Sequence, residues 1–124
     1  MYVFTRSNGE WSQQQKLAAD EGNRGRFGDG VALSDSGETA LIGASLGASA
    51  YVFTNSGGEW TQQQTLTGEG SSFGIRVALS DERTALISAP GSTKNFTGAV
   101  VVFTSSDGEW SRQQKLTADD GDVE

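Results

Sequence analysis

The chain reads YVFTRSNGEWSQQQKL from residue 2 to residue 17 and repeats this pattern at residues 51–66 (YVFTNSGGEWTQQQTL) and 101–116 (VVFTSSDGEWSRQQKL). Each copy has a β-rich run, a two-residue turn and a second run that starts with Trp. The turn pairs are Asn8-Gly9, Gly57-Gly58 and Asp107-Gly108. Such pairs favour positive φ at both central residues, as a type I′ turn requires. Each copy is therefore predicted to be a β-hairpin.

A second pattern lies between these copies, FGDGVALSDSGETALIGAS at residues 27–45 and FGIRVALSDERTALISAP at residues 73–90. Each has two short apolar runs around a polar turn, which predicts another hairpin. No segment shows sustained helical periodicity, so we expect all-β structure with no substantial helix. Strands are expected near residues 2–5, 11–17, 31–34, 39–44, 50–54, 60–66, 76–80, 84–89, 99–104 and 110–116. A repeat of about fifty residues with four short strands is typical of a β-propeller blade.

The second pattern resembles the FG-GAP repeats of integrin-α-type propellers and related prokaryotic surface proteins. The motifs that carry this resemblance are Phe27-Gly28, Phe73-Gly74, residues 39–44 (TALIGA) and residues 87–90 (ISAP). The resemblance implies a single domain over residues 1–124 with antiparallel four-stranded blades, about two and a half per chain. The first hairpin, residues 2–17, is a half blade, residues 27–66 and 73–116 are blades, and residues 117–124 are a tail. The resemblance also implies an extracellular or cell-surface location.

Composition excludes several classes of function. The chain contains no Cys and no His, which removes thiolate nucleophiles, the usual zinc ligands and Ser-His-Asp triads. Its formal net charge of −7 argues against a nucleic-acid partner, because phosphate binding needs a basic face. No run of apolar residues is long enough for a membrane span. We therefore expect a non-enzymatic protein with no resident cofactor.

The resemblance raises the question of calcium, because some FG-GAP blades carry a loop of acidic oxygens between their first two strands. A hard cation needs six or more oxygen ligands, and these loops offer few. The weak metal candidates are Asp35, Glu38, Asp119, Asp120 and Asp122. Asn95 lies in an Asn-Phe-Thr sequon, which is a low-grade candidate for glycosylation in an exported protein.

Two and a half blades cannot close a propeller, which needs at least about four. The chain is therefore expected to be a fragment of a longer protein or to self-associate into a ring or filament through its end blades. The residues assigned to such assembly are Tyr2, Val3, Phe4, Trp11, Leu17, Val101, Phe103, Trp110 and Leu116. The Gln tracts are interpreted as a polar rim, or as ladders between stacked subunits.

The three Trp residues leave an alternative open. We expect Trp60 and Trp110 to be at least half buried in equivalent packing sites, with Trp11 differing because its half blade lacks the other hairpin. The alternative is a lectin-like module in which Trp11, Trp60 and Trp110 stack on sugars. Other surface proteins and glycans are thus further candidate partners.

Overall fold

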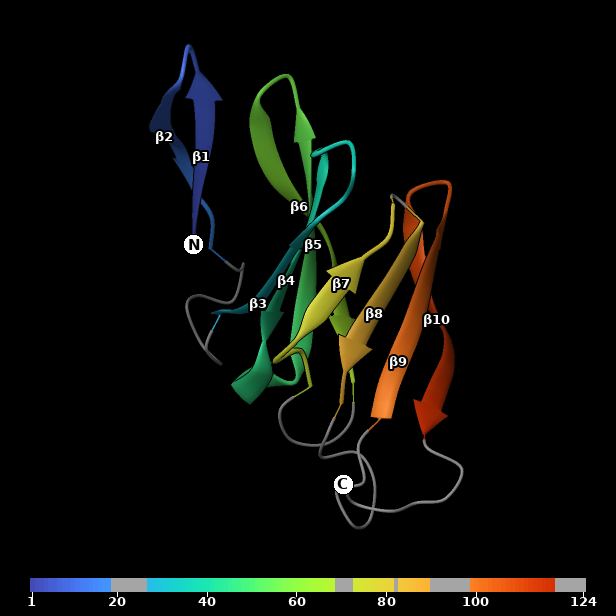
Figure 1. Ribbon diagram of the computed structural model, residues 1–124. Coiled ribbons are helices and arrows are strands. Elements are labelled where there is room, and N and C mark those ends of the chain that lie inside the picture. The colour runs from blue at the N-terminus through green and yellow to red at the C-terminus, as the bar shows by residue number, and fades with distance from the viewer. Residues whose placement is uncertain (19–26, 69–72, 82, 90–98, 118–124) are drawn as a thin grey trace.

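The computed structural model describes residues 1–18, 27–68, 73–81, 83–89 and 99–117, which form three antiparallel sheets stacked side by side (Figure 1). The first hairpin pairs β1 (Tyr2–Ser7) with β2 (Glu10–Lys16). Blade 1 contains β3 (Phe27–Leu33), β4 (Thr39–Ala44), β5 (Ser49–Ser56) and β6 (Glu59–Thr67), with the short 3₁₀ turn η1 (Ser45–Gly47) before β5. Blade 2 contains β7 (Val77–Leu79), β8 (Thr84–Ser88), β9 (Ala99–Ser106) and β10 (Glu109–Thr117).

The all-β fold and all ten expected strands are confirmed. Neighbouring strands in each sheet follow one another along the chain, and the sheets do not close into a ring. The largest difference is at β3, which begins at Phe27 rather than near residue 31, because Phe27 pairs with Ala44 across an irregularity in the ladder. The Phe-Gly motif of blade 1 is therefore part of a strand.

The hairpin turns have the backbone conformation that their residue pairs predict. Positive φ occurs at both central residues in all three turns, at 54° and 83° for Asn8 and Gly9, 62° and 92° for Gly57 and Gly58, and 55° and 85° for Asp107 and Gly108. This conformation matches the right-handed twist of the paired strands, which explains why the three hairpins have the same shape.

Every Trp-bearing strand contains a β-bulge at the same place. In β6 the ladder passes from the pair Phe53–Gln62 to the pair Val52–Gln64, so Gln63 has no partner on β5. The same irregularity leaves Gln14 unpaired in β2 and Gln113 unpaired in β10. A bulge bends its strand and redirects the side chains beside it, and here it lies within each Gln tract.

Apolar side chains form two cores, one on each face of blade 1. The first core lies between the blades and joins Leu41, Val52 and Leu66 of blade 1 to Ile87 and Phe103 of blade 2. The second core lies between blade 1 and the first hairpin, where Leu17 packs with Ile42, Phe53 and Trp60. Among the described strands, blade 1 therefore has a neighbouring sheet on both faces, whereas each of the other two sheets has one on a single face (Figure 1).

Glycine allows the two blades to approach each other closely at one point. A Cβ atom added to Gly43 of β4 would run into the carbonyl group of Gly74, which precedes β7. Gly74 itself has a φ of +94°, a conformation that L side chains rarely adopt. The Phe-Gly turn of blade 2 thus packs its backbone directly on the β4 backbone of blade 1.

Candidate protein interaction surface

The first hairpin exposes side chains whose counterparts in the blades are buried. We call Tyr2, Phe4 and Trp11 the N-terminal face. Their exposed fractions are 51%, 52% and 66%, whereas those of the counterparts Tyr51, Phe53 and Trp60 in blade 1 are 6%, 3% and 8%. The same residue types therefore bury their side chains wherever another sheet covers them.

The outer face of blade 2 shows the same contrast at the other end of the stack. We call Leu86, Val100, Val102, Gln114 and Leu116 the C-terminal face. Leu86 and Leu116 are 42% and 44% exposed, whereas their counterparts Leu41 and Leu66 in blade 1 are 0% and 3% exposed. The two ends of the molecule thus present the two halves of the contact that joins blade 1 to blade 2 inside the chain.

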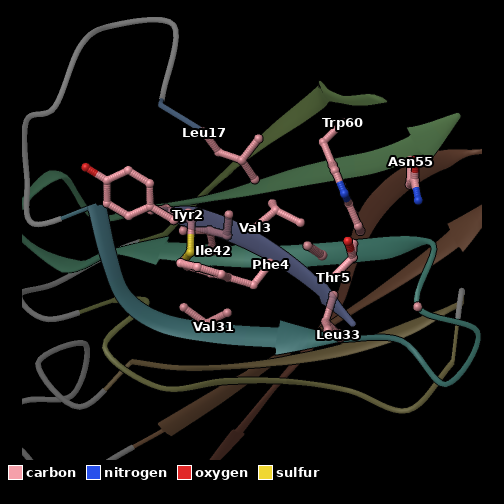
Figure 2. Close-up of a pocket in the computed structure, with 13 residues that line it drawn as sticks. Tyr2, Val3, Phe4, Thr5, Leu17, Val31, Leu33, Ile42, Asn55 and Trp60 are labelled. Carbon is pink, nitrogen blue, oxygen red and sulfur yellow. The ribbon is translucent and has the colours of Figure 1, made fainter. Parts of the chain in front are cut away.

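An apolar hollow of about 270 Å³ lies beside the N-terminal face, between the first hairpin and blade 1. Figure 2 shows that β1, β3 and β4 contribute its walls, with Phe4, Val31, Leu33 and Ile42 among the lining side chains. The first hairpin packs on β4, β5 and β6 through the core of Leu17, and Val31 and Leu33 of β3 stay 50% and 59% exposed. In the contact between the blades, β7 packs against β3 and fills the corresponding space.

A pair of glutamine side chains ties each sheet to the next. Gln15 of the first hairpin accepts a hydrogen bond from the Trp60 backbone N–H at 2.9 Å and donates one to the Trp60 carbonyl at 2.8 Å. Gln64 of blade 1 accepts from the Trp110 N–H at 2.8 Å and donates to the Trp110 carbonyl at 2.6 Å. We call this arrangement the Gln–Trp clamp.

The clamp provides hydrogen-bond partners for the backbone of edge strands. β6 and β10 are the outermost strands of their blades, so half of their backbone N–H and C=O groups point away from the sheet. An amide side chain offers one donor and one acceptor in a plane, as a neighbouring strand would. The clamp therefore pairs the backbone of Trp60 and Trp110 while it fixes the spacing between consecutive sheets.

Trp60 and Trp110 are buried in equivalent sites, as expected, and Trp11 is exposed. The predicted assembly residues fall into two groups. Tyr2, Phe4, Trp11 and Leu116 are exposed, and Val3 is partly buried against the core below the first hairpin. The remaining assembly residues, Leu17, Val101, Phe103 and Trp110, are buried within the chain. Their side chains face blade 1, where they pack in the two cores that join the sheets of a single chain.

The acidic candidates do not gather into a site in the part of the chain that the structure describes. Asp35 and Glu38 are both exposed in the loop between β3 and β4. Ser34 and Ser36 hold that loop together, since the Ser34 hydroxyl accepts from the Thr39 N–H and the Ser36 hydroxyl from the Glu38 N–H. Within the described ranges, no three His, Cys, Asp or Glu side chains are grouped as metal ligands. Asp119, Asp120, Asp122 and Asn95 lie outside the described residues.

The Phe-Gly motifs, at the start of β3 and before β7, and the four-stranded antiparallel sheets match the expectation from sequence. Residues 11–57 match the family model of the FG-GAP repeat. The FG-GAP match extends from the Trp strand of the first hairpin to the turn after β5. FG-GAP repeats typically occur in extracellular proteins and suggest a propeller-type binding module. A search of curated proteins gives no significant match to the chain. Among the described residues, no helix is long and apolar enough to cross a membrane.

The Gln–Trp clamp is the feature that sequence reasoning missed. The sequence predicts that the Gln tracts form a polar rim or ladders. In the structure the third residue of the tract bonds to the next sheet at Gln15 and Gln64, whereas the second residue bonds within its own strand. Gln14, Gln63 and Gln113 donate locally to a hydroxyl two residues earlier, at Ser12, Thr61 and Ser111. Glutamine at the third position of all three tracts, at Gln15, Gln64 and Gln114, was the available signal.

Proposed function

We propose that this FG-GAP module is not an enzyme and that it acts by protein–protein interaction, through self-assembly of its end sheets into a ring or filament at the cell surface. The observation that carries the proposal is the contrast in exposure between equivalent residues. Phe4 and Leu116 are about half exposed at the ends, whereas Phe53 and Leu66 are buried in the interior of the stack.

The free energy of apolar burial favours covering both ends. Burial of a large apolar side chain stabilises a protein by roughly 1.5–3 kcal/mol. Each end exposes several such side chains on one continuous sheet face, which is typical of an interaction site rather than of scattered surface residues. The two ends differ from each other, so contacts between copies are of the head-to-tail type, which generates rings or filaments.

Sedimentation velocity over a concentration series tests the proposal. We expect the 124-residue chain to form discrete oligomers or filaments at micromolar concentration. Phe4→Asp places a charge on the N-terminal face and is expected to weaken assembly strongly. Gln14→Asp places the same charge on an exposed side chain that bonds only to Ser12, and is expected to leave assembly unchanged. A folded monomer at micromolar concentration would contradict the proposal.

A lectin-like function remains the alternative, and its support is the exposed indole of Trp11. The burial of Trp60 and Trp110 removes a stacking platform at each of these repeats. A glycan array decides between the two functions. Binding that a free sugar displaces and that Trp11→Ala abolishes would favour the lectin function.

A further inference from the structure

The described part of the chain contains two complete Gln–Trp clamps and the two separate halves of a third. The register of the repeats makes Gln114 of β10 the counterpart of Gln15 and Gln64. Gln114 is exposed, and its side chain makes no hydrogen bond with any residue that the structure describes. The glutamine half of the clamp is therefore free at the C-terminal face.

The receiving half of the clamp is at the N-terminal face. In a two-residue hairpin, the pair that flanks the turn exchanges both backbone hydrogen bonds, and the next pair exchanges none. In the first hairpin the flanking pair is Ser7–Glu10 and the next is Arg6–Trp11. The N–H and C=O of Trp11 therefore point away from β1, as those of Trp60 do where Gln15 binds them.

A single side chain indicates what kind of sheet covers the C-terminal face. Ser88 is the blade 2 counterpart of Gly43, at which blade 1 receives the Phe-Gly turn of the following blade. A Cβ atom at Gly43 would collide with the carbonyl of Gly74, so the same close contact cannot form at Ser88. The sheet that stacks on blade 2 therefore lacks a Phe-Gly turn at this point. The first hairpin meets this requirement, because its sheet consists of β1 and β2 and has no counterparts of β7 and β8, the strands that follow the Phe-Gly turn in blade 2.

We propose that Gln114 of one copy clamps the backbone of Trp11 in a second copy, so that the C-terminal face of the first copy covers the N-terminal face of the second. The inference rests on the proposed self-assembly and adds the residue that sets its register and direction. Leu116 and Val102 then pack on Phe4 and Tyr2 of the second copy, as Leu66 and Val52 pack in the core between the blades.

Two isosteric variants test the clamp. Gln114→Glu keeps the side-chain shape but loses the donor to the Trp11 carbonyl and places a carboxylate against that oxygen. We expect the dissociation constant between copies to rise by about tenfold or more, since one of the two hydrogen bonds is lost and the carboxylate repels the Trp11 carbonyl oxygen. Gln113→Glu adds the same charge one residue earlier, where the wild-type side chain bonds to Ser111, and is expected to change the constant by less than about twofold.

Sedimentation velocity gives the dissociation constants, and far-UV circular dichroism confirms that both variants are folded. If the wild type assembles and the two variants behave alike, the clamp is refuted while the proposed self-assembly stands. If the wild type is a folded monomer at micromolar concentration, both the clamp and the proposed self-assembly are refuted.

A mixing experiment tests the direction of the contact. Phe4→Asp blocks the N-terminal face and Leu116→Asp blocks the C-terminal face, and both side chains are exposed in the single chain. Each variant alone is expected to stay monomeric, and an equimolar mixture is expected to form a one-to-one heterodimer through the two unblocked faces. A dimer of either variant alone would show a symmetric contact and would overturn the head-to-tail arrangement.

Discussion

Glutamine suits the clamp because its amide has the donor and acceptor arrangement of a peptide group on a flexible stem. Asparagine has the same amide but a shorter reach, and glutamate cannot donate. The bulge at the preceding residue redirects the strand just before the clamp residue, at Gln14 before Gln15 and at Gln63 before Gln64. The role of each Gln is thus set by its place relative to the bulge.

Gln64→Ala removes the clamp inside the chain and leaves the N–H and C=O of Trp110 without their partner. We expect a loss of about 1–3 kcal/mol in the free energy of unfolding, because the clamp makes two partly buried hydrogen bonds. Gln63→Ala is the matched control, since Gln63 is exposed and its side chain bonds locally to Thr61, and it is expected to cost less than about 0.5 kcal/mol. Urea unfolding measures both. Equal effects would mean that the clamp contributes nothing to stability.

Gly43→Ser places in blade 1 the residue that blade 2 has at the equivalent position. The new Cβ must displace the Gly74 backbone, so we expect a loss of about 2–3 kcal/mol in the free energy of unfolding. The reciprocal change Ser88→Gly loses one hydrogen bond from the Arg76 N–H and is expected to cost about 1 kcal/mol. Thermal unfolding that ranked Ser88→Gly as the more damaging change would contradict the packing of the Phe-Gly turn.

At the scale of elements, the hairpins could be predicted because their signals are local. The turn pairs determine the backbone at each tip, and the apolar runs beside them identify the strands. The bulges could not be predicted, since QQQ and RQQ offer equally polar residues at every register. The sequence also could not predict which sheet Val101 and Phe103 pack against, because an apolar face of a strand does not indicate which neighbour covers it. The free ends and the buried joint between blades therefore looked alike.

Gly108→Ala tests the turn in the last hairpin. Gly108 has a φ of +85°, which costs an L residue roughly 1–2 kcal/mol, so we expect a loss of about that size in the free energy of unfolding. Asp107→Gly is the control at the neighbouring position, where φ is also positive at 55°, and it is expected to be neutral within about 0.5 kcal/mol. Comparable destabilisation by both variants would argue against a type I′ turn.

At the scale of the whole molecule, the proposed assembly would bring chains of like charge together. Each chain carries a formal net charge of −7, and the side chains at the proposed joint are mostly apolar. Salt screens repulsion, since the Debye length falls from about 30 Å at 0.01 M to about 8 Å at 0.15 M. We therefore expect association to strengthen as sodium chloride is raised over this range, as measured by sedimentation velocity. Dissociation on adding salt would mean that ion pairs hold the copies together.

The Gln–Trp clamp contacts only the main chain of the residue that it holds. Its amide bonds to a backbone N–H and C=O, which every residue except proline has, so the clamp makes no use of the indole side chain. The clamp therefore depends on the position of the backbone of the edge strand, whereas the apolar side chains around it depend on which residues they contact. In the proposed contact between copies, replacing Trp11 by any residue except proline would keep the two clamp hydrogen bonds and would change only the packing around them.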